Sequence, residues 1–237
     1  SQVNVSFVGA GNYTSKTILP KISKNDVNFI GIGSENGMSG TLLGKKYGFK
    51  NSTTDIDSLI NDSSSNTIFI TTRHDTHSDF VIKALKANKN VFVEKPLCIK
   101  LQELNDIKKT YLEASKKNKN LKLMVGFNRR FSPQIEKIKS LLKTSKEKAS
   151  FIMTVNSGYL PKDHWTQDKN VGGGRIVGEA CHFLDLLLYL SGGNIESWSS
   201  VKMKSSTNDT LSISLEFDNG SIGCINYFSN GPTALPK

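Results

Sequence analysis

Three side chains that can exchange protons follow one another at helical spacing in the second half of the sequence. Glu179, His182 and Asp185 occupy positions i, i + 3 and i + 6 of a segment whose later residues are almost all apolar, so they are expected along one stripe of a buried helix. Buried charges usually have a partner or a task. Two interpretations follow: a core histidine held by Asp185, or a general base, His182, positioned by a neighbouring carboxylate.

A lysine stands at the end of a short apolar strand in the first half. Residues 91–93 read Val-Phe-Val and are followed by Glu94, Lys95 and Pro96. Because proline does not continue a central strand, Lys95 is expected at the carboxyl end of this strand. Ligands bind at that edge in open α/β sheets. Lys95 is therefore either a solvated charge or a cation directed into a site.

A glycine turn near the start of the sequence is a candidate binding site for a nucleotide. The apolar strand at residues 3–8 runs into Gly9 and Gly11 and then into a helix-compatible segment at residues 17–23. Strand, glycine turn and helix are the context of a dinucleotide fingerprint. Gly9 permits the tight turn, and Gly11 lets backbone amides approach a pyrophosphate. The third fingerprint position holds Thr14 in place of Gly or Ala, so the motif is incomplete.

The end of the second strand bears on the choice between NAD and NADP. NAD-binding proteins commonly place an acid there, which binds the adenosine ribose. After the strand at residues 28–33, Ser34 takes that place and Glu35 follows. Glu35 suits the ribose of NAD, whereas Ser34 would tolerate a 2′-phosphate. Because no arginine follows to hold such a phosphate, the sequence favours NAD.

Two histidines follow another apolar strand, residues 67–72. His74 and His77 are three positions apart, a spacing that also occurs in metal sites. No third ligand is close in the sequence, so no metal is expected. The two histidines are expected to lie over the cofactor at the carboxyl end of the strand.

The order of the elements predicts the fold class. Strands and helices alternate over residues 1–126, which predicts an α/β Rossmann domain, a doubly wound parallel sheet that binds NAD(P). After residue 126 strands dominate, and residues 127–237 predict an α+β domain with a large, mainly antiparallel sheet for substrate binding and oligomerisation. Its expected elements are one helix at 131–145, strands at 150–156, 196–204, 210–217 and 222–228, and a hairpin turn at 218–220.

Composition excludes several classes of protein. No run of eighteen apolar residues and no signal pattern occur, so neither a membrane span nor export is expected. We therefore expect a cytoplasmic location. Cys98, Cys181 and Cys224 are too far apart for a disulfide framework. The net charge of +10 is spread over helix faces without interleaved aromatics, so no binding of nucleic acid is expected.

The segments above, in this order, resemble the glucose–fructose oxidoreductase / inositol dehydrogenase / MocA (Gfo/Idh/MocA) family. The matching elements cover almost the whole chain. They are Gly9-x-Gly11, residues 71–77, Glu94-Lys95-Pro96, Gly-Phe-Asn-Arg-Arg-Phe at 126–131, and Gly-Gly-Gly at 172–174 followed by His182-x-x-Asp185.

The resemblance implies an NAD(P)-dependent oxidoreductase that moves a hydride between nicotinamide and a carbinol carbon of a sugar, cyclitol or nucleotide-sugar. His182 would then be the base, Lys95 the donor that steadies the developing alkoxide, and Asp185 the residue that orients His182. Members of the family often carry Asp four residues before this histidine, where the present sequence has Gly178. Either Glu179 takes that role or proton transfer runs through His182 alone.

The resemblance also distributes the other site residues. Candidate cofactor contacts are Gly9, Gly11, Asn12, Tyr13, Ser34, Glu35, Thr71, Thr72, Arg73, His77, Glu94, Lys95 and Pro96. Candidate substrate contacts are Lys95, Asn128, Arg129, Arg130, Tyr159, Lys162, His164, Trp165 and His182. Asn128 and Arg129 could equally be structural. A basic pocket of this kind suits a uronate or a sugar diphosphate.

The chain looks closer still to the C-terminal half of bacterial two-part oxidoreductases, in which a zinc-type alcohol-dehydrogenase-like module comes first. The four segments that carry this likeness are residues 72–74, 125–133, 158–165 and 174–185. The chain begins on its first strand and ends before the family's sheet is complete, so we expect a fragment of a longer protein. An exposed sheet face predicts a homodimer or homotetramer. The alternative function is a dinucleotide-binding module without turnover that serves a partner domain or assembly, which Thr14, Gly178 and the short C-terminus favour.

Overall fold

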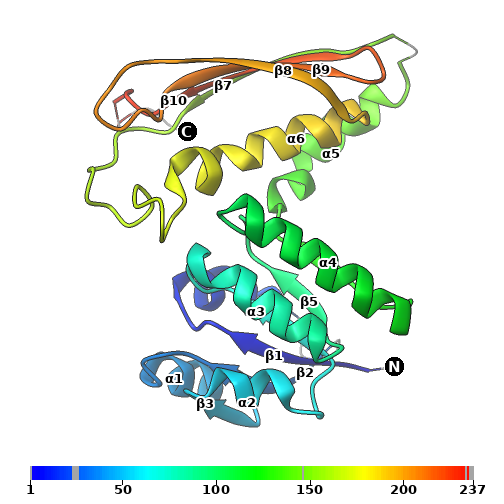
Figure 1. Cartoon of the computed structure of the whole chain (residues 1–237), viewed down its shortest axis with the longest axis vertical. Helices are drawn as coiled ribbons and strands as arrows, with labels where there is room; N and C mark the ends of the chain where they lie inside the picture. Colours follow the sequence, from blue (N-terminus) through cyan, green and yellow to red (C-terminus); the bar gives the residue numbers. More distant parts are fainter. Residues whose placement is uncertain (1, 23–26, 146, 233, 235–237) are drawn as a thin grey trace. The chain divides into compact units, whose positions relative to one another are not determined.

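The computed structural model describes residues 2–22, 27–145, 147–232 and 234. The chain divides into two compact units, Ser1–Gly126 and Phe127–Lys237 (Figure 1). Within the described residues, no helix is long and apolar enough to cross a membrane.

The first unit is a parallel sheet of the doubly wound type, as the sequence predicts. Its strands lie in the order β3-β2-β1-β4-β5-β6, and every neighbouring pair is parallel. The order reverses between β1 and β4, and ligands of such sheets bind at the carboxyl ends of the strands beside the reversal. The bounds are β1 Val3–Val8, β2 Val27–Gly33, β3 Asn51–Thr53, β4 Thr67–Ile70, β5 Asn90–Val93 and β6 Leu123–Val125.

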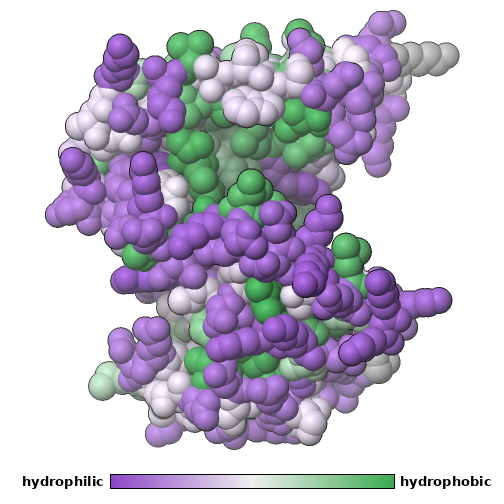
Figure 2. Space-filling model, viewed as in Figure 1, coloured by the Kyte–Doolittle hydropathy of each residue, from purple (hydrophilic) through white to green (hydrophobic). Residues whose placement is uncertain are grey.

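Alternate residues of these strands fill a core on each face of the sheet, as expected for strands that are covered on both sides. Phe7 of β1 is fully buried on one face, where its ring stacks on Phe69 with centroids 4.7 Å apart. Val8, the next residue, belongs to the core on the other face. The covering helices are η1 Thr14–Ile18, α1 Met38–Tyr47, α2 Ile56–Asn61, α3 His74–Lys86 and α4 Leu101–Lys117. Hydrophilic side chains dominate the face of this unit seen in Figure 2.

Some boundaries differ from those the sequence predicts. The helix after β4, α3, begins at His74, soon after the strand, and Arg73 is its N-cap. Strand β3 was not predicted, because three edge residues carry too little hydrophobic pattern. The π-helical turn η1 covers Thr14–Ile18, whereas Ser23, where a helix was expected to end, lies outside the described residues.

The second unit is a four-stranded sheet covered on one face by helix α6, Cys181–Ser191 (Figure 1). The strand order is β7-β10-β9-β8, with β9 antiparallel to both neighbours and β7 parallel to β10. Leu211, Ile213, Leu215 and Phe217 alternate into the core, as predicted for β9. The bounds are β7 Ser150–Asn156, β8 Ile195–Lys202, β9 Leu211–Phe217 and β10 Ile222–Phe228.

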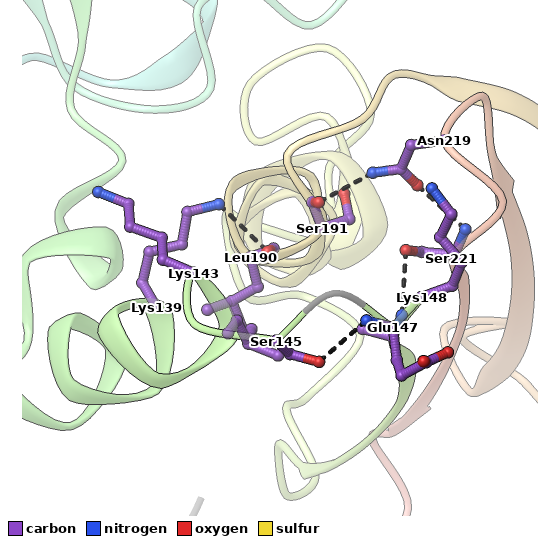
Figure 3. A pocket seen from close by; sticks show the side chains of 11 residues that line it. Lys139, Lys143, Ser145, Glu147, Lys148, Leu190, Ser191, Asn219 and Ser221 are labelled. Atoms are coloured by element: carbon purple, nitrogen blue, oxygen red, sulfur yellow. Dashed lines mark hydrogen bonds between the residues drawn. The ribbon is translucent and has the colours of Figure 1, made fainter.

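The helix predicted at residues 131–145 is two elements, η2 Asn128–Phe131 and α5 Pro133–Leu142. Ser132 separates them, because its hydroxyl accepts a hydrogen bond from the backbone N of Ile135 and so caps α5. Lys139 of α5 donates hydrogen bonds to two carbonyls at the end of α6, that of Tyr189 and that of Leu190, the second of which is drawn in Figure 3. It lines a cavity of about 260 Å³ that contains none of the predicted site residues.

Candidate active site

Gly9 has a conformation and surroundings that only glycine accepts. Its φ is +109°, and a Cβ there would lie 2.7 Å from Thr71 Oγ1 and 2.8 Å from the carbonyl oxygen of Thr71. Gly11 differs, since a Cβ there would meet nothing within 4 Å. The turn therefore packs closely against the end of β4 at Gly9 and leaves open space beside Gly11.

Thr14, at the third fingerprint position, braces the turn from inside. It is fully buried, and its Oγ1 lies 2.7 Å from Thr71 Oγ1. Both hydroxyls also reach the carbonyl of Gly9, at 3.2 Å from Thr14 and 3.1 Å from Thr71. Thr14, which stands where the fingerprint has Gly or Ala, thus forms a hydrogen-bonded link between the turn after β1 and the end of β4. Thr71, predicted to contact the cofactor, has its hydroxyl in this link.

Ser34 and Glu35 stand beside the turn, because the backbone N of Gly9 bonds the carbonyl of Gly33 at 2.8 Å. Ser34 Oγ accepts a hydrogen bond from the backbone N of Gly40 in the first turn of α1, at 3.2 Å. Glu35, the next residue, is exposed. Ser34 is thus committed to the start of α1, and the Glu35 side chain faces solvent.

Glu94, Lys95 and Pro96 follow β5 at the same edge. The backbone N of Glu94 bonds Ile70 of β4, and the backbone N of Gly126 bonds Val93. Burial raises the pKa of Glu94 to about 7. The Lys95–Pro96 peptide bond is cis, and Lys95 is half-buried.

His77 supports this loop and does not lie over it. The ring is fully buried, with Nδ1 at 2.7 Å from the carbonyl of Pro96 and Nε2 at 3.2 Å from the carbonyl of Thr72. Burial lowers the pKa of His77. The expectation that its side chain contacts the cofactor is wrong, since the side chain has no accessible surface; it joins the loops after β4 and β5. Arg73, the N-cap of α3, is exposed.

In the second unit, Asp185 forms an ion pair with Arg130. Arg130 Nε donates to Asp185 Oδ2 at 2.6 Å, and Nη2 donates to Oδ1. Both carboxylate oxygens of Asp185 bind the guanidinium, and the orienting role of Asp185 toward His182 stays a prediction. The ring of His182 packs edge-on against Phe127, with centroids 6.2 Å apart.

Glu179 lies in a buried polar cluster. Its Oε2 accepts hydrogen bonds from Arg175 Nε at 3.1 Å and from the hydroxyl of Tyr227 at 2.6 Å, and its Oε1 accepts one from Ser157 at 2.9 Å. The carboxylate of Glu179 is thus held by the side chains of Arg175, Tyr227 and Ser157. The choice between Glu179 and His182 alone for proton transfer stays a prediction.

The remaining candidates are on η2 and on the loop between β7 and η3, Ile176–Ala180. Arg129 lies over the ring of Phe183, the neighbour of His182, at 4.8 Å, while Asn128 opens η2. Tyr159 and Lys162 are exposed, and His164 and Trp165 are half-buried. His164 Nδ1 accepts a hydrogen bond from the backbone N of Thr166 at 3.3 Å. In the neutral ring Nε2 must then carry the proton, so His164 presents an N–H donor.

The comparisons decide the family. Residues 3–127 match the family model "Oxidoreductase family, NAD-binding Rossmann fold" of Gfo/Idh/MocA proteins, and residues 148–234 match the model of the Gfo/Idh/MocA C-terminal domain. The chain belongs to the Gfo/Idh/MocA family.

Gfo/Idh/MocA relatives include three named enzymes. Myo-inositol 2-dehydrogenase of Thermotoga maritima is 28% identical over 192 residues, which are 76% of this chain and 55% of that protein. Levoglucosan dehydrogenase of Pseudarthrobacter phenanthrenivorans is 30% identical over 157 residues, 62% of this chain and 38% of that protein. Oxidoreductase cns1 of Cordyceps militaris is 27% identical over 210 residues, 85% of this chain and 25% of that protein. The chain thus spans between a quarter and just over half of these relatives.

Solved structures of the Gfo/Idh/MocA type share the fold. Levoglucosan dehydrogenase in complex with NADH and levoglucosan superposes with a TM-score of 0.82 at 22% identity, covering 98% of this chain and 68% of that one. GenD2 from gentamicin A biosynthesis, in complex with NAD, gives 0.81 at 20% identity, covering 99% and 68%. At these identities the likeness shows the fold alone.

Three buried residues around Glu179 were missed in the sequence: Arg175, Asp209 and Tyr227. Arg175 carried a signal, since it stands four positions before Glu179 in an otherwise apolar segment of this family's motif. Asp209 and Tyr227 carried none, because they reach the cluster from elsewhere in the chain. Among the described residues, no group of three or more His, Cys, Asp or Glu is arranged to hold a metal ion.

Proposed function

We propose that this chain forms an NAD(P)-dependent dehydrogenase that moves a hydride between nicotinamide and a carbinol carbon of a sugar or cyclitol. The observation that carries the proposal is that Gly11, Ser34 and Lys95 stand at the carboxyl edge of one parallel sheet, after strands β1, β2 and β5 around the reversal of strand order. Relatives named as dehydrogenases of myo-inositol and levoglucosan support the substrate class.

The glycine turn fits a dinucleotide. The open space beside Gly11 suits a pyrophosphate at the start of the following helix, so we assign the pyrophosphate to residues 9–13. The nicotinamide half is assigned to the loops after β4 and β5, with Thr72, Arg73 and Glu94 as contacts. When bound, the group accepts or delivers the hydride.

Glu35 supports a preference for NAD. The hydroxyl of Ser34 is engaged by the backbone of Gly40, which leaves the exposed carboxylate of Glu35 as the group for the ribose. A carboxylate binds ribose hydroxyls and repels a 2′-phosphate. No arginine precedes Arg73 in the sequence to offset that repulsion.

Lys95 and His182 are assigned to the proton chemistry. Oxidation of an alcohol needs a base for the hydroxyl proton and a donor for the developing alkoxide. We assign His182 of the second unit as the base and Lys95 of the first as the donor. Asp185 and Glu179 are given no proton transfer in this proposal, since their carboxylates bind Arg130 and Arg175.

The substrate is expected to be rich in oxygen acceptors. Arg129, Lys162 and His164 supply N–H donors, and guanidinium and ammonium groups suit carboxylates and phosphates. A uronate or nucleotide-sugar is therefore the preferred class within the sugars and cyclitols.

Three features of the native protein stay proposals. A homodimer or homotetramer is supported by the sheet face away from α6, where Ile152 and Val201 are 81% and 77% exposed. A two-part protein with an upstream module is supported by residues 158–165, which resemble a segment in the C-terminal half of bacterial two-part oxidoreductases. A cytoplasmic location is supported by three cysteines that are free in the structure.

Thermal unfolding with NAD, NADH, NADP and NADPH, followed by turnover assays with inositol, levoglucosan, uronates and UDP-sugars, tests the proposal. A nicotinamide dinucleotide should raise the unfolding midpoint, since it binds the folded chain only, and NAD should be reduced with at least one sugar. Binding without turnover on any sugar would favour the alternative of a non-catalytic module. No midpoint shift with any dinucleotide would overturn the proposal.

A further inference from the structure

Arg175 is one of the most buried charged residues described in the chain, with 2% of its side chain exposed. It precedes η3 and makes hydrogen bonds in several directions. Nη1 donates to the carbonyl of Gly158 at 2.6 Å, and Nη2 donates to the carbonyl of Ser157 at 2.9 Å. The same guanidinium binds Glu179 through Nε and Nη2.

These contacts hold both ends of one loop. The chain leaves β7 at Ser157 and Gly158, passes through Tyr159, Lys162, His164 and Trp165, and returns through the glycines at 172–174 to Arg175 itself. The guanidinium therefore joins the first residues of the loop to the residue directly after it. A loop closed at its base in this way loses most of its freedom to open.

Asp209 adds a second anchor on the far side of the loop. Its Oδ2 accepts a hydrogen bond from Gln167 Nε2 at 3.0 Å and lies 3.9 Å from Arg175 Nη1. Burial raises the pKa of Asp209, but hydrogen bonds from Ser229, Thr207 and Gln167 outweigh that effect and hold the pKa below its ordinary value. Asp209 is therefore a carboxylate at neutral pH, and it links Gln167 to the same cation.

A buried ion cluster of this kind is a poor source of stability, since desolvation of the charges offsets their attraction, and apolar residues of similar size often stabilise a fold better. The gain is geometrical: a guanidinium has five donors in a fixed plane and can fix several oxygens at once. In this cluster, backbone carbonyls of the loop are among the fixed oxygens.

We propose that Arg175 is the positioning residue of the loop at residues 158–174 and, through it, sets the affinity for the sugar. Its removal frees the loop while His182 and the dinucleotide turn keep their surroundings. This inference rests on the proposed function only in the statement about the sugar, because the order of the loop can be measured without catalysis.

Limited trypsin digestion measures that order, since Lys162 and Lys169 are exposed within the loop. Arg175→Met keeps the stem and removes the donors, and Arg175→Lys keeps the charge without the planar fork. Both should be cut at Lys162 and Lys169 at least tenfold faster than wild type. Gln167→Met, which removes the outer anchor alone, should be cut several-fold faster and serves where an Arg175 variant does not fold.

Lys139→Met is the matched control. It removes the hydrogen bonds to the end of α6 in the same unit, outside the loop, so it should lower the unfolding midpoint and leave cleavage at Lys162 and Lys169 unchanged. Loop cleavage in Arg175→Met and Gln167→Met no faster than in Lys139→Met would overturn the inference, whether or not any sugar is turned over.

Steady-state kinetics complete the test. In an active enzyme, Arg175→Lys and Gln167→Met should raise KM for the sugar about tenfold, change kcat less than threefold and leave the dinucleotide Kd unchanged. A fall in kcat at constant KM would contradict a positioning role, because it would assign Arg175 to the chemical step.

Discussion

Arg130 and Asp185 form a two-point ion pair that joins the Asn-Arg-Arg segment to α6, 55 positions along the chain. The side chain of Asp185 is 7% exposed and that of Arg130 is 35% exposed. Two of the segments that carry the resemblance to the family, each assigned to the site from the sequence, therefore meet in a structural contact. The side chain of Asp185 holds η2 against the helix that carries His182.

Asp185→Asn tests this assignment. The change leaves the guanidinium without its counter-charge, so the free energy of unfolding should fall by about 2 kcal/mol, less than for a fully buried pair because Arg130 is partly exposed. The pKa of the base in the pH profile of kcat/KM should stay where it is in wild type. Urea unfolding and the pH profile measure the two effects. A displaced pH profile at unchanged stability would restore the orienting role.

Lys95→Met and His182→Gln should each lower kcat by about two orders of magnitude, the scale of a lost general acid or base. The dinucleotide should still raise the unfolding midpoint of both variants. Lys100→Met is the matched control, because Lys100 is an exposed lysine five positions after Lys95, and it should turn over at the wild-type rate. Wild-type rates in both site variants would remove the two residues from the mechanism.

The sequence predicted elements whose signal is local. Strands β7 and β10 have the predicted bounds. Each of these depends on neighbours within a few residues, which is the range over which propensity and periodicity act.

The contacts that define the site were beyond that range. The hydrogen bond between the hydroxyls of Thr14 and Thr71 joins residues that are 57 positions apart, and the bond from Tyr227 to Glu179 joins residues that are 48 positions apart. Spacing along a helix placed Glu179, His182 and Asp185 on one stripe, but it could not reveal that Arg130, from another element, binds the carboxylate of Asp185. The sequence therefore predicted which residues gather in the second unit better than it predicted their partners.

Gly11→Ala and Gly9→Ala separate binding from folding. A methyl group at Gly11 meets no atom within 4 Å, so the free energy of unfolding of Gly11→Ala should lie within about 0.5 kcal/mol of the wild-type value. It should bind the dinucleotide at least tenfold more weakly, since the methyl group fills the space assigned to the pyrophosphate. Calorimetric titration with NADH measures the affinity. Wild-type affinity in Gly11→Ala would contradict the assignment of the turn.

Gly9→Ala is the counterpart. Its φ of +109° and the 2.7 Å approach to Thr71 are incompatible with a side chain, so the free energy of unfolding should fall by about 2 kcal/mol or more. Its loss of binding would follow from damage to the turn, whereas the loss in Gly11→Ala would occur in an intact fold.

Glu94 should make the stability of the first unit depend on pH. Burial raises its pKa from the ordinary 4.5 to about 7, so between these values the folded chain holds a proton that the unfolded chain has released. Stability that is fully present below pH 4.5 is therefore lost progressively as the pH rises to about 7, and the loss is complete above that.

Glu94→Gln removes this titration and keeps a similar shape. At pH 8 the variant should be more stable than wild type by on the order of 1 kcal/mol, a value reduced for the partial exposure of the carboxyl group. At pH 4.5 the two should unfold alike. Urea unfolding across this range measures the difference, with Glu113→Gln, an exposed glutamate of α4, as the control that should follow wild type at every pH. Parallel curves for wild type and Glu94→Gln would mean that the carboxyl group of Glu94 is hydrated in solution, and the raised pKa would then have no part in the behaviour of the site.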